Sequence, residues 1–190
     1  MRKARFYRDV AVLVAIAVIG APARAPGQPP APAQQQPMAV FTDPKARFTI
    51  EYPAAWEVQT KSGEGEKSEA TFLGGRAIRF GWAAVQVFGA PPAEVRSPQE
   101  LARGVQAAIR KDYPSYQSLQ DGPANIAGHE GYYFYYTRTE KEGASWYYIR
   151  VYMLFPARTV VLSGGMPNDA RLIQDNFPLI LRILWSFRPT

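Results

Sequence analysis

The chain has 190 residues, no cysteine, a single histidine and a formal net charge of +6. The lack of cysteine excludes disulfides, thiolate chemistry and a lipid-bearing cysteine. Residues 1–25 hold five basic residues and one acidic residue, so most of the net charge lies there. The remaining Lys and Arg are mixed with Asp and Glu, a pattern that argues against a nucleic-acid partner.

Residues 1–25 have the features of a secretory signal peptide. A basic start precedes an apolar run over 10–19, which is too short for a membrane span of about 20 residues. Small residues offer cleavage after Ala23 or Ala25, and we favour Ala23 because Pro26 disfavours the second site. We therefore expect a periplasmic or secreted protein with no stable membrane span after cleavage. A retained leader that acts as an anchor is the alternative.

Residues 26–37 are rich in proline and lack large apolar side chains, which predicts an extended, disordered linker. Residues 38–190 are enough for one domain with its own core. In that domain, Phe48, Ile50 and Tyr52 alternate with polar residues, as in a half-buried strand. Further strands are expected at 56–58, 70–73 and 77–88, with a polar loop at 61–67.

A helix is predicted from Ser97 to about Tyr113. The Ser97 hydroxyl can accept from a free backbone N–H of the first turn, and the Glu100 side chain can in turn accept from the backbone N–H of Ser97. Pro98 has no backbone N–H, and none is needed at the first position of a helix. The apolar stripe that would pack on a sheet consists of Leu101, Val105, Ile109 and Tyr113.

The second half of the domain is predicted to consist of strands followed by a helix. Strands are expected at 116–126, 132–139, 145–155 and 158–162, the last ended by Gly164-Gly165, and short turns make them antiparallel neighbours. A short helix or turn at 167–176 is expected to precede a final helix that starts at Pro178 and ends near Trp185. The fold class is α+β, with one antiparallel sheet and two principal helices.

Several of these segments resemble the PsbP-like (Mog1/PsbP) domains, a family with many exported bacterial members. The resemblance covers most of residues 41–188 and rests on three motifs: Phe48-x-Ile50-x-Tyr52-Pro53-x-x-Trp56, Ile126-x-Gly128-x-x-Gly131 and the closing Leu184-Trp185-Ser186-Phe187-Arg188. It implies an α/β/α sandwich and a role in binding rather than catalysis. The family includes photosystem II extrinsic subunits, so a photosystem-associated role is a minor alternative.

Candidate catalytic and metal-binding residues are few. His129 lies in a glycine-flanked turn, where a polar residue is ordinary turn chemistry. With no second histidine and no cysteine, we predict no metal site and no cofactor. The serines lack the Gly-x-Ser-x-Gly elbow, so a hydrolase that uses His129 is the last of the alternatives.

Aromatic side chains are concentrated in the two strands at 132–139 and 145–155. On the second strand the more apolar set should face the core, and the other set should face the opposite way. That second set, predicted as a binding surface, consists of Trp146, Tyr148, Arg150 and Tyr152. The alternative, which the sandwich fold favours, is that a helix covers this face as well.

The sequence therefore leads to ranked hypotheses of function. The first is an exported, non-enzymatic domain that binds a protein partner or an envelope component through the exposed part of the aromatic surface. The second is a small-molecule carrier with a ligand between sheet and helix. An open aromatic patch would favour the first, and a closed tyrosine-lined cavity the second.

Overall fold

The computed structural model describes residues 36–45, 47–62, 67–75 and 81–190. The predicted signal peptide, nearly all of the linker and parts of the expected loop at 61–67 and strand at 77–88 lie outside the described residues. Within these ranges, no helix is both long enough and apolar enough to cross a membrane.

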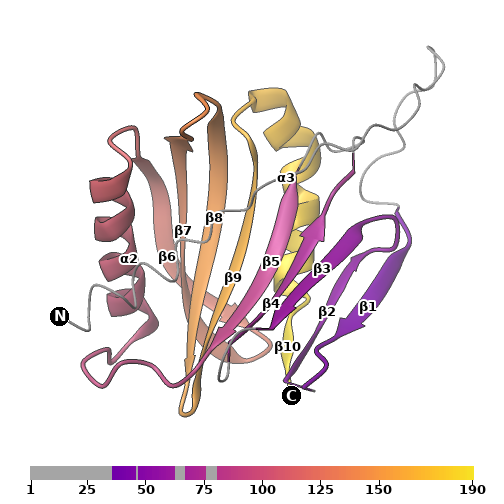
Figure 1. Cartoon of the computed structure of the whole chain (residues 1–190), viewed down its shortest axis with the longest axis vertical. Helices are drawn as coiled ribbons and strands as arrows, with labels where there is room; N and C mark the ends of the chain where they lie inside the picture. The colour runs from indigo at the N-terminus through magenta and orange to yellow at the C-terminus, as the bar shows by residue number, and fades with distance from the viewer. Residues whose placement is uncertain (1–35, 46, 63–66, 76–80) are drawn as a thin grey trace.

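Seven antiparallel strands form the main sheet, in the spatial order β3-β4-β5-β9-β8-β7-β6 (Figure 1). Hairpins join β6 to β7, β7 to β8 and β8 to β9, which confirms the predicted antiparallel neighbours. The bounds of the seven strands are β3 Glu57–Ser62, β4 Ser68–Leu73, β5 Trp82–Phe88, β6 Gln117–Ile126, β7 His129–Thr139, β8 Ser145–Phe155 and β9 Arg158–Pro167.

A second sheet was not foreseen. It consists of β1 (Met38–Thr42), β2 (Phe48–Pro53) and β10 (Arg188–Pro189), with β2 in the middle. The strand expected at 48–52 therefore belongs to this smaller sheet and not to a single common one. Phe48 and Ile50 on β2 are 1% exposed because they pack into the same core as the final helix.

The two helices cover opposite faces of the main sheet (Figure 1). Helix α2 (Pro98–Asp112) connects β5 to the far edge strand β6 and packs against β7 and β8. Helix α3 (Ala170–Trp185) packs against β9 and β5 on the other side, next to the small sheet. We call these the α2 face and the α3 face. The arrangement confirms the predicted α+β fold with helices on both sides of the sheet.

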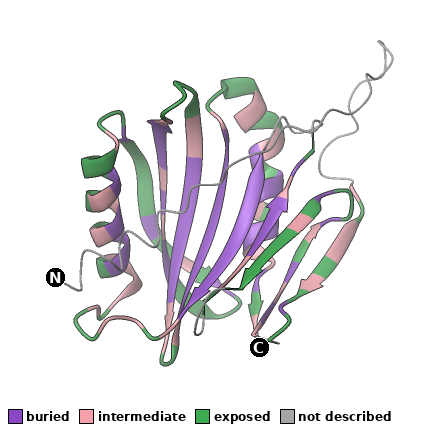
Figure 2. Ribbon diagram, viewed as in Figure 1, coloured by how far each residue is buried: buried purple, intermediate pink, exposed green. Residues whose placement is uncertain are grey.

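Each face has its own apolar core, and the central strands are buried on both sides (Figure 2). On the α3 face, Ile149, Val151 and Met153 of β8 pack with the inner stripe of α3. On the α2 face, Tyr148 and Tyr152 of β8 pack under Leu101, Val105 and Ile109 of α2. The predicted stripe of α2 thus faces the sheet.

The start of α2 confirms the predicted cap with one change of partner. The backbone N–H of Glu100 donates to Ser97 Oγ at 3.2 Å, as an N-cap requires. The Glu100 carboxylate accepts from the backbone N–H of Arg96 at 2.8 Å. The reciprocal bond of the capping box therefore reaches one residue further than expected.

The predicted break at Pro178 is wrong. Helix α3 runs from Ala170 to Trp185 without interruption, with Pro178 inside it. Proline removes a backbone donor and crowds the preceding turn, but Pro178 lies on the exposed side of α3. Phe177, Ile180 and Ile183 remain buried against the sheet, so tertiary packing outweighs the local preference to end the helix.

The predicted end of a strand at Gly164-Gly165 is also wrong, because β9 continues to Pro167. A Cβ on Gly164 would lie 2.4 Å from Ile180 Cγ2 of α3. A Cβ on Gly165 would lie 2.8 Å from the ring of Tyr148 on the opposite face. These glycines therefore serve close packing on both faces of β9 and do not terminate it.

Candidate functional site

The four predicted binding residues on β8 do not form an open surface. Trp146 is half-buried, Tyr148 and Arg150 are 7% exposed, and Tyr152 has no exposure. Helix α2 covers this face, as the alternative interpretation expected. Direct contact with a partner by Tyr148, Arg150 or Tyr152 would need α2 to move, whereas Trp146 lies at the rim.

Arg150 is a buried charge on the α2 face. Its Nη1 donates to Tyr152 Oη at 3.4 Å. Burial alone would lower the pKa of Arg150, but the neighbouring oxygens of Tyr136 and Tyr152 raise it overall, so the guanidinium keeps its charge. Tyrosine hydroxyls thus supply acceptors for a buried cation, which explains why this polar set can lie in the interior.

The rim around Trp146 contains an ordered group that we call the aromatic corner. It consists of Tyr113 at the end of α2, Arg138 on β7, Glu140 in the following turn, and Trp146 and Tyr148 on β8. The Arg138 guanidinium lies 3.8 Å from the ring centroid of Tyr113 and 4.9 Å from that of Tyr148. The Trp146 and Tyr148 rings stack at 6.2 Å.

A shared carboxylate fixes the aromatic corner. Glu140 Oε1 accepts from Arg138 Nε at 2.7 Å and from the hydroxyl of Tyr148. Burial raises the pKa of Tyr148, so its hydroxyl stays protonated and remains a donor. The neighbouring tyrosines and Glu140 raise the pKa of Arg138 against the effect of burial. The carboxylate therefore orders both side chains, and the Arg138 guanidinium keeps its charge. The half-buried Tyr113 and Trp146 lie at the edge of the group.

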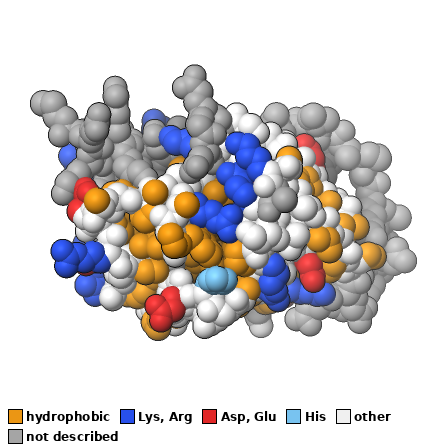
Figure 3. Space-filling view, turned by 90° about the horizontal axis from the view of Figure 1, so that it is seen from below, with side chains coloured by type: hydrophobic (Ala, Val, Ile, Leu, Met, Phe, Trp, Pro, Cys, Tyr) orange, Lys and Arg blue, Asp and Glu red, His pale blue; other side chains and the backbone are white. Residues whose placement is uncertain are grey.

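A second feature lies at the opposite end of the sheet, where the two sheets meet. It is a cavity of about 290 Å³ lined by Lys45, Arg47, Val87, Phe88, Ala157 and Arg158. We call it the basic pocket. Figure 3 shows this end of the molecule, where apolar side chains gather at the centre and lysine and arginine side chains lie beside them.

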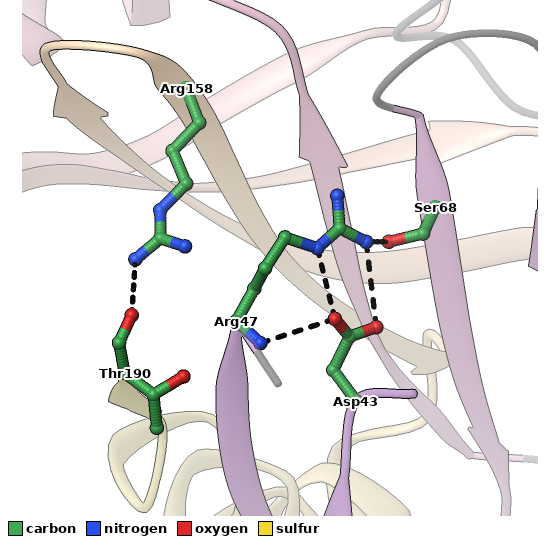
Figure 4. Close-up of polar contacts among 5 residues, drawn as sticks. All are labelled: Asp43, Arg47, Ser68, Arg158 and Thr190. Carbon is green, nitrogen blue, oxygen red and sulfur yellow. Dashed lines mark hydrogen bonds and ion pairs between the residues drawn. The ribbon is translucent and has the colours of Figure 1, made fainter. Parts of the chain in front are cut away.

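The two arginines of the basic pocket are held by the protein itself. Arg47 Nε donates to Asp43 Oδ2 at 2.9 Å, and Arg47 also donates to the Ser68 hydroxyl. Arg158 Nη2 donates to the main-chain oxygen of Thr190 at 3.1 Å. In Figure 4 the Arg47 guanidinium points toward Asp43 and Ser68, and the Arg158 guanidinium points toward Thr190. Burial would raise the pKa of Asp43, but the bonds and charge of Arg47 hold it below its ordinary value.

The residues considered for catalysis make contacts that stabilise the fold. His129 begins β7 and its ring lies 5.1 Å from that of Phe155. Ser97 caps α2. The Ser115 hydroxyl donates to the backbone oxygen of Thr139 and accepts from its backbone N–H. Across the described ranges, His, Asp and Glu side chains nowhere gather in the groups of three that could hold a metal ion.

Sequence reasoning missed the basic pocket and most of the aromatic corner. The pocket residues stand at positions 45, 47, 87, 88, 157 and 158, and only the strand order brings them together. Arg138 lies directly across from Trp146 in the β7–β8 register. The predicted hairpin could have pointed to that pair, because cross-strand neighbours are set by the turn length.

Comparison with known proteins concerns the fold. Neither a protein-family model nor a curated protein matches the sequence. Cyanobacterial PsbP (CyanoP) from Synechocystis is similar in structure, with a TM-score of 0.61 and 10% identity over 80% of this chain and 92% of that one. LpqN of Mycobacterium tuberculosis, described as involved in cell envelope biogenesis, gives 0.54 and 10% identity over 82% and 87%.

The Ran-binding protein Mog1p from Saccharomyces cerevisiae gives a TM-score of 0.54 and 8% identity over 81% of this chain and 96% of that one. Identities this low carry the architecture but not the activity. The chain therefore has a Mog1/PsbP-like fold.

Proposed function

We propose that this chain is an exported, non-enzymatic binding domain that acts on a protein partner or an envelope component. Two proteins of similar fold support an interaction role by analogy, since one is described as Ran-binding and the other as involved in envelope biogenesis. Fold analogy is weak support for function, so the proposal rests mainly on the aromatic corner.

The observation that carries the proposal is the half-buried Trp146, stacked on a fixed Tyr148 and bordered by Arg138. Tryptophan, tyrosine and arginine are the residues enriched at the energetic centres of interfaces. Since Glu140 already orders Arg138 and Tyr148, a partner would lose little side-chain entropy here on binding. Tyr148 and Arg138 act in this proposal as supports, and Trp146 with Tyr113 makes the contact.

The test is affinity capture of the tagged protein from a cross-linked envelope extract of the native cell. We expect one dominant partner, and we expect Trp146→Ala to reduce its recovery by about tenfold or more, as loss of a central interface residue does. Thermal unfolding of the variant checks that the domain remains folded.

Leu119→Ala is the matched control. Leu119 is 52% exposed on the edge strand β6, so its truncation also removes exposed apolar surface but leaves the aromatic corner intact. Recovery should be unchanged in this variant. Equal recovery with wild type and Trp146→Ala would contradict the proposed contact, and recovery of nothing above background would contradict the interaction role.

Export is the second part of the proposal. The supporting observation is the basic and apolar pattern of residues 1–25. N-terminal sequencing of the protein from the periplasm or medium of the native cell tests it directly. A new terminus at Arg24 or Pro26 is the expected result. An intact Met1 on a protein that fractionates with the cytoplasm would contradict it.

A further inference from the structure

The basic pocket concentrates positive charge around a small cavity. Lys45, Arg47 and Arg158 contribute three cationic side chains to its lining, and no lining residue is acidic. Asp43, the carboxylate that accepts from Arg47, is 4% exposed and is not among the lining residues. Fixed cations around a partly desolvated hollow attract an anion more strongly than cations spread over open surface.

The arginines are positioned before any ligand arrives. Asp43 and Ser68 fix the direction of the Arg47 side chain. Arg158 lies over the Phe155 ring, with Cζ 5.0 Å from its centroid, and already donates to an oxygen atom of Thr190. Guanidinium groups held in this way suit carboxylate and phosphate oxygens. An anion would therefore meet ordered donors and cause little loss of side-chain freedom.

The rest of the pocket is apolar. Val87 and Phe88 come from the end of β5, and Ala157 comes from the turn between β8 and β9. The volume of about 290 Å³ is at the small end of the range for ligand pockets. It has room for one charged group and a short apolar portion, and it does not have room for a large cofactor.

We infer that the basic pocket binds a small organic anion, a carboxylate or phosphate carried on a short apolar stem. The anionic group lies among Lys45, Arg47 and Arg158, and the stem lies against Val87, Phe88 and Ala157. This site is independent of the proposed function, because it lies at the other end of the main sheet from the aromatic corner. Trp146 pairs with Pro167 at one end of the β8–β9 ladder, and Phe155 pairs with the pocket residue Arg158 at the other.

The test is an NMR titration of the purified full-length chain, which follows the backbone amides of Phe88, Ala157 and Arg158. The probes are phenylacetate, phenyl phosphate, phenylacetamide and inorganic phosphate. Both aryl anions should shift the amide resonances of the pocket residues, and added salt should weaken their binding. Neutral phenylacetamide should not bind, and inorganic phosphate should bind about tenfold more weakly because it has no stem. The tighter aryl anion identifies the preferred head group.

Three substitutions locate the binding. Ala157→Asp places a carboxylate on an exposed turn of the pocket wall and should weaken the aryl anion by at least about tenfold. Lys45→Gln should weaken it about threefold to tenfold. Arg171→Gln is the control, because it removes one charge from a 91% exposed side chain in the first turn of α3, at the other end of the sheet.

Ala157→Ser tests whether any change at the turn is harmful in itself, and it should bind as wild type does. Equal binding of phenylacetate and phenylacetamide would overturn the inference. So would shifts confined to residues outside the pocket, or unchanged affinity in a folded Ala157→Asp variant. Equal weakening by Arg171→Gln and Lys45→Gln would also overturn it, since the effect would then be one of net charge alone.

Discussion

Both faces of the main sheet carry a buried core, but the two cores differ in chemistry. The α3 face is filled mainly by aliphatic and phenylalanine side chains, and Gly164 lets α3 approach β9 closely. The α2 face carries several tyrosines and the guanidinium of Arg150 under an amphipathic helix. The difference shows that polar side chains on one face of a strand do not prove that this face is exposed, because tyrosine hydroxyls can accept hydrogen bonds from a buried cation.

The largest expected effect breaks the close packing on the α3 face. Gly164→Ala places a methyl group 2.4 Å from Ile180 Cγ2 and 3.2 Å from the backbone oxygen of Trp82. The helix or the strand must shift, so we expect the free energy of unfolding to fall by about 3 kcal/mol. Denaturant unfolding measures the change.

Gly75→Ala is the control, because a Cβ there has no neighbour within 4 Å, and it should change stability by less than about 0.5 kcal/mol. In a double-mutant cycle, Ile180→Ala should recover part of the loss at Gly164. Equal stability of the two glycine variants would show that the approach of α3 does not depend on Gly164.

The next effect concerns the buried cation of the α2 face. Tyr152→Phe keeps the ring but removes the oxygen that accepts from Arg150 at 3.4 Å. A buried charge that loses an acceptor destabilises the folded state, here by about 1–2 kcal/mol. Unfolding at neutral pH measures it, with Tyr133→Phe as the control, since Tyr133 Oη bonds the exposed side chain of Gln120. A stabilised Tyr152→Phe variant would mean that Arg150 does not need this oxygen.

A smaller effect compares how the two helices begin. Ser97 caps α2 and Asp169 caps α3, each through one bond to a backbone N–H, at 3.2 Å and 2.9 Å. Ser97→Ala and Asp169→Ala should each lower stability by about 1 kcal/mol. A much larger loss for one of them would show that the corresponding helix depends more on its cap than on its packing.

The sequence was sufficient for the elements whose periodicity matches their burial. The cap at Ser97, the stripe of α2 and the hairpins of β6 to β9 were predicted because local pattern and tertiary packing agree there. Prediction failed at Pro178 and at Gly164-Gly165, where packing against the sheet decides and local preference does not.

The candidate sites were less accessible to sequence reasoning. The alternation of apolar and polar side chains along β8 correctly separated those that face α3 from those that face α2. It does not show which element covers each face. Trp146 could be chosen as a rim residue only after α2 had been placed over Tyr148 and Tyr152. The basic pocket depends on the pairing of β5 with β9 and on a second sheet, and these are long-range features that no local pattern encodes.

The smallest expected effect sharpens the comparison through pH. Burial raises the pKa of Tyr152 from 10.0 to about 12, and Tyr136 adds to the rise while Arg150 opposes it. A raised pKa in the folded state means that the stabilising contribution is complete below pH 10 and is lost as the pH rises toward about 12. We therefore expect wild type to lose stability across this window faster than Tyr152→Phe, whose ring cannot ionise. The destabilisation caused by Tyr152→Phe at neutral pH should then shrink as the pH rises. Chemical unfolding of both proteins at several alkaline pH values measures the gap, and a gap that stays constant would mean that Tyr152 ionises as easily in the folded chain as in the unfolded one.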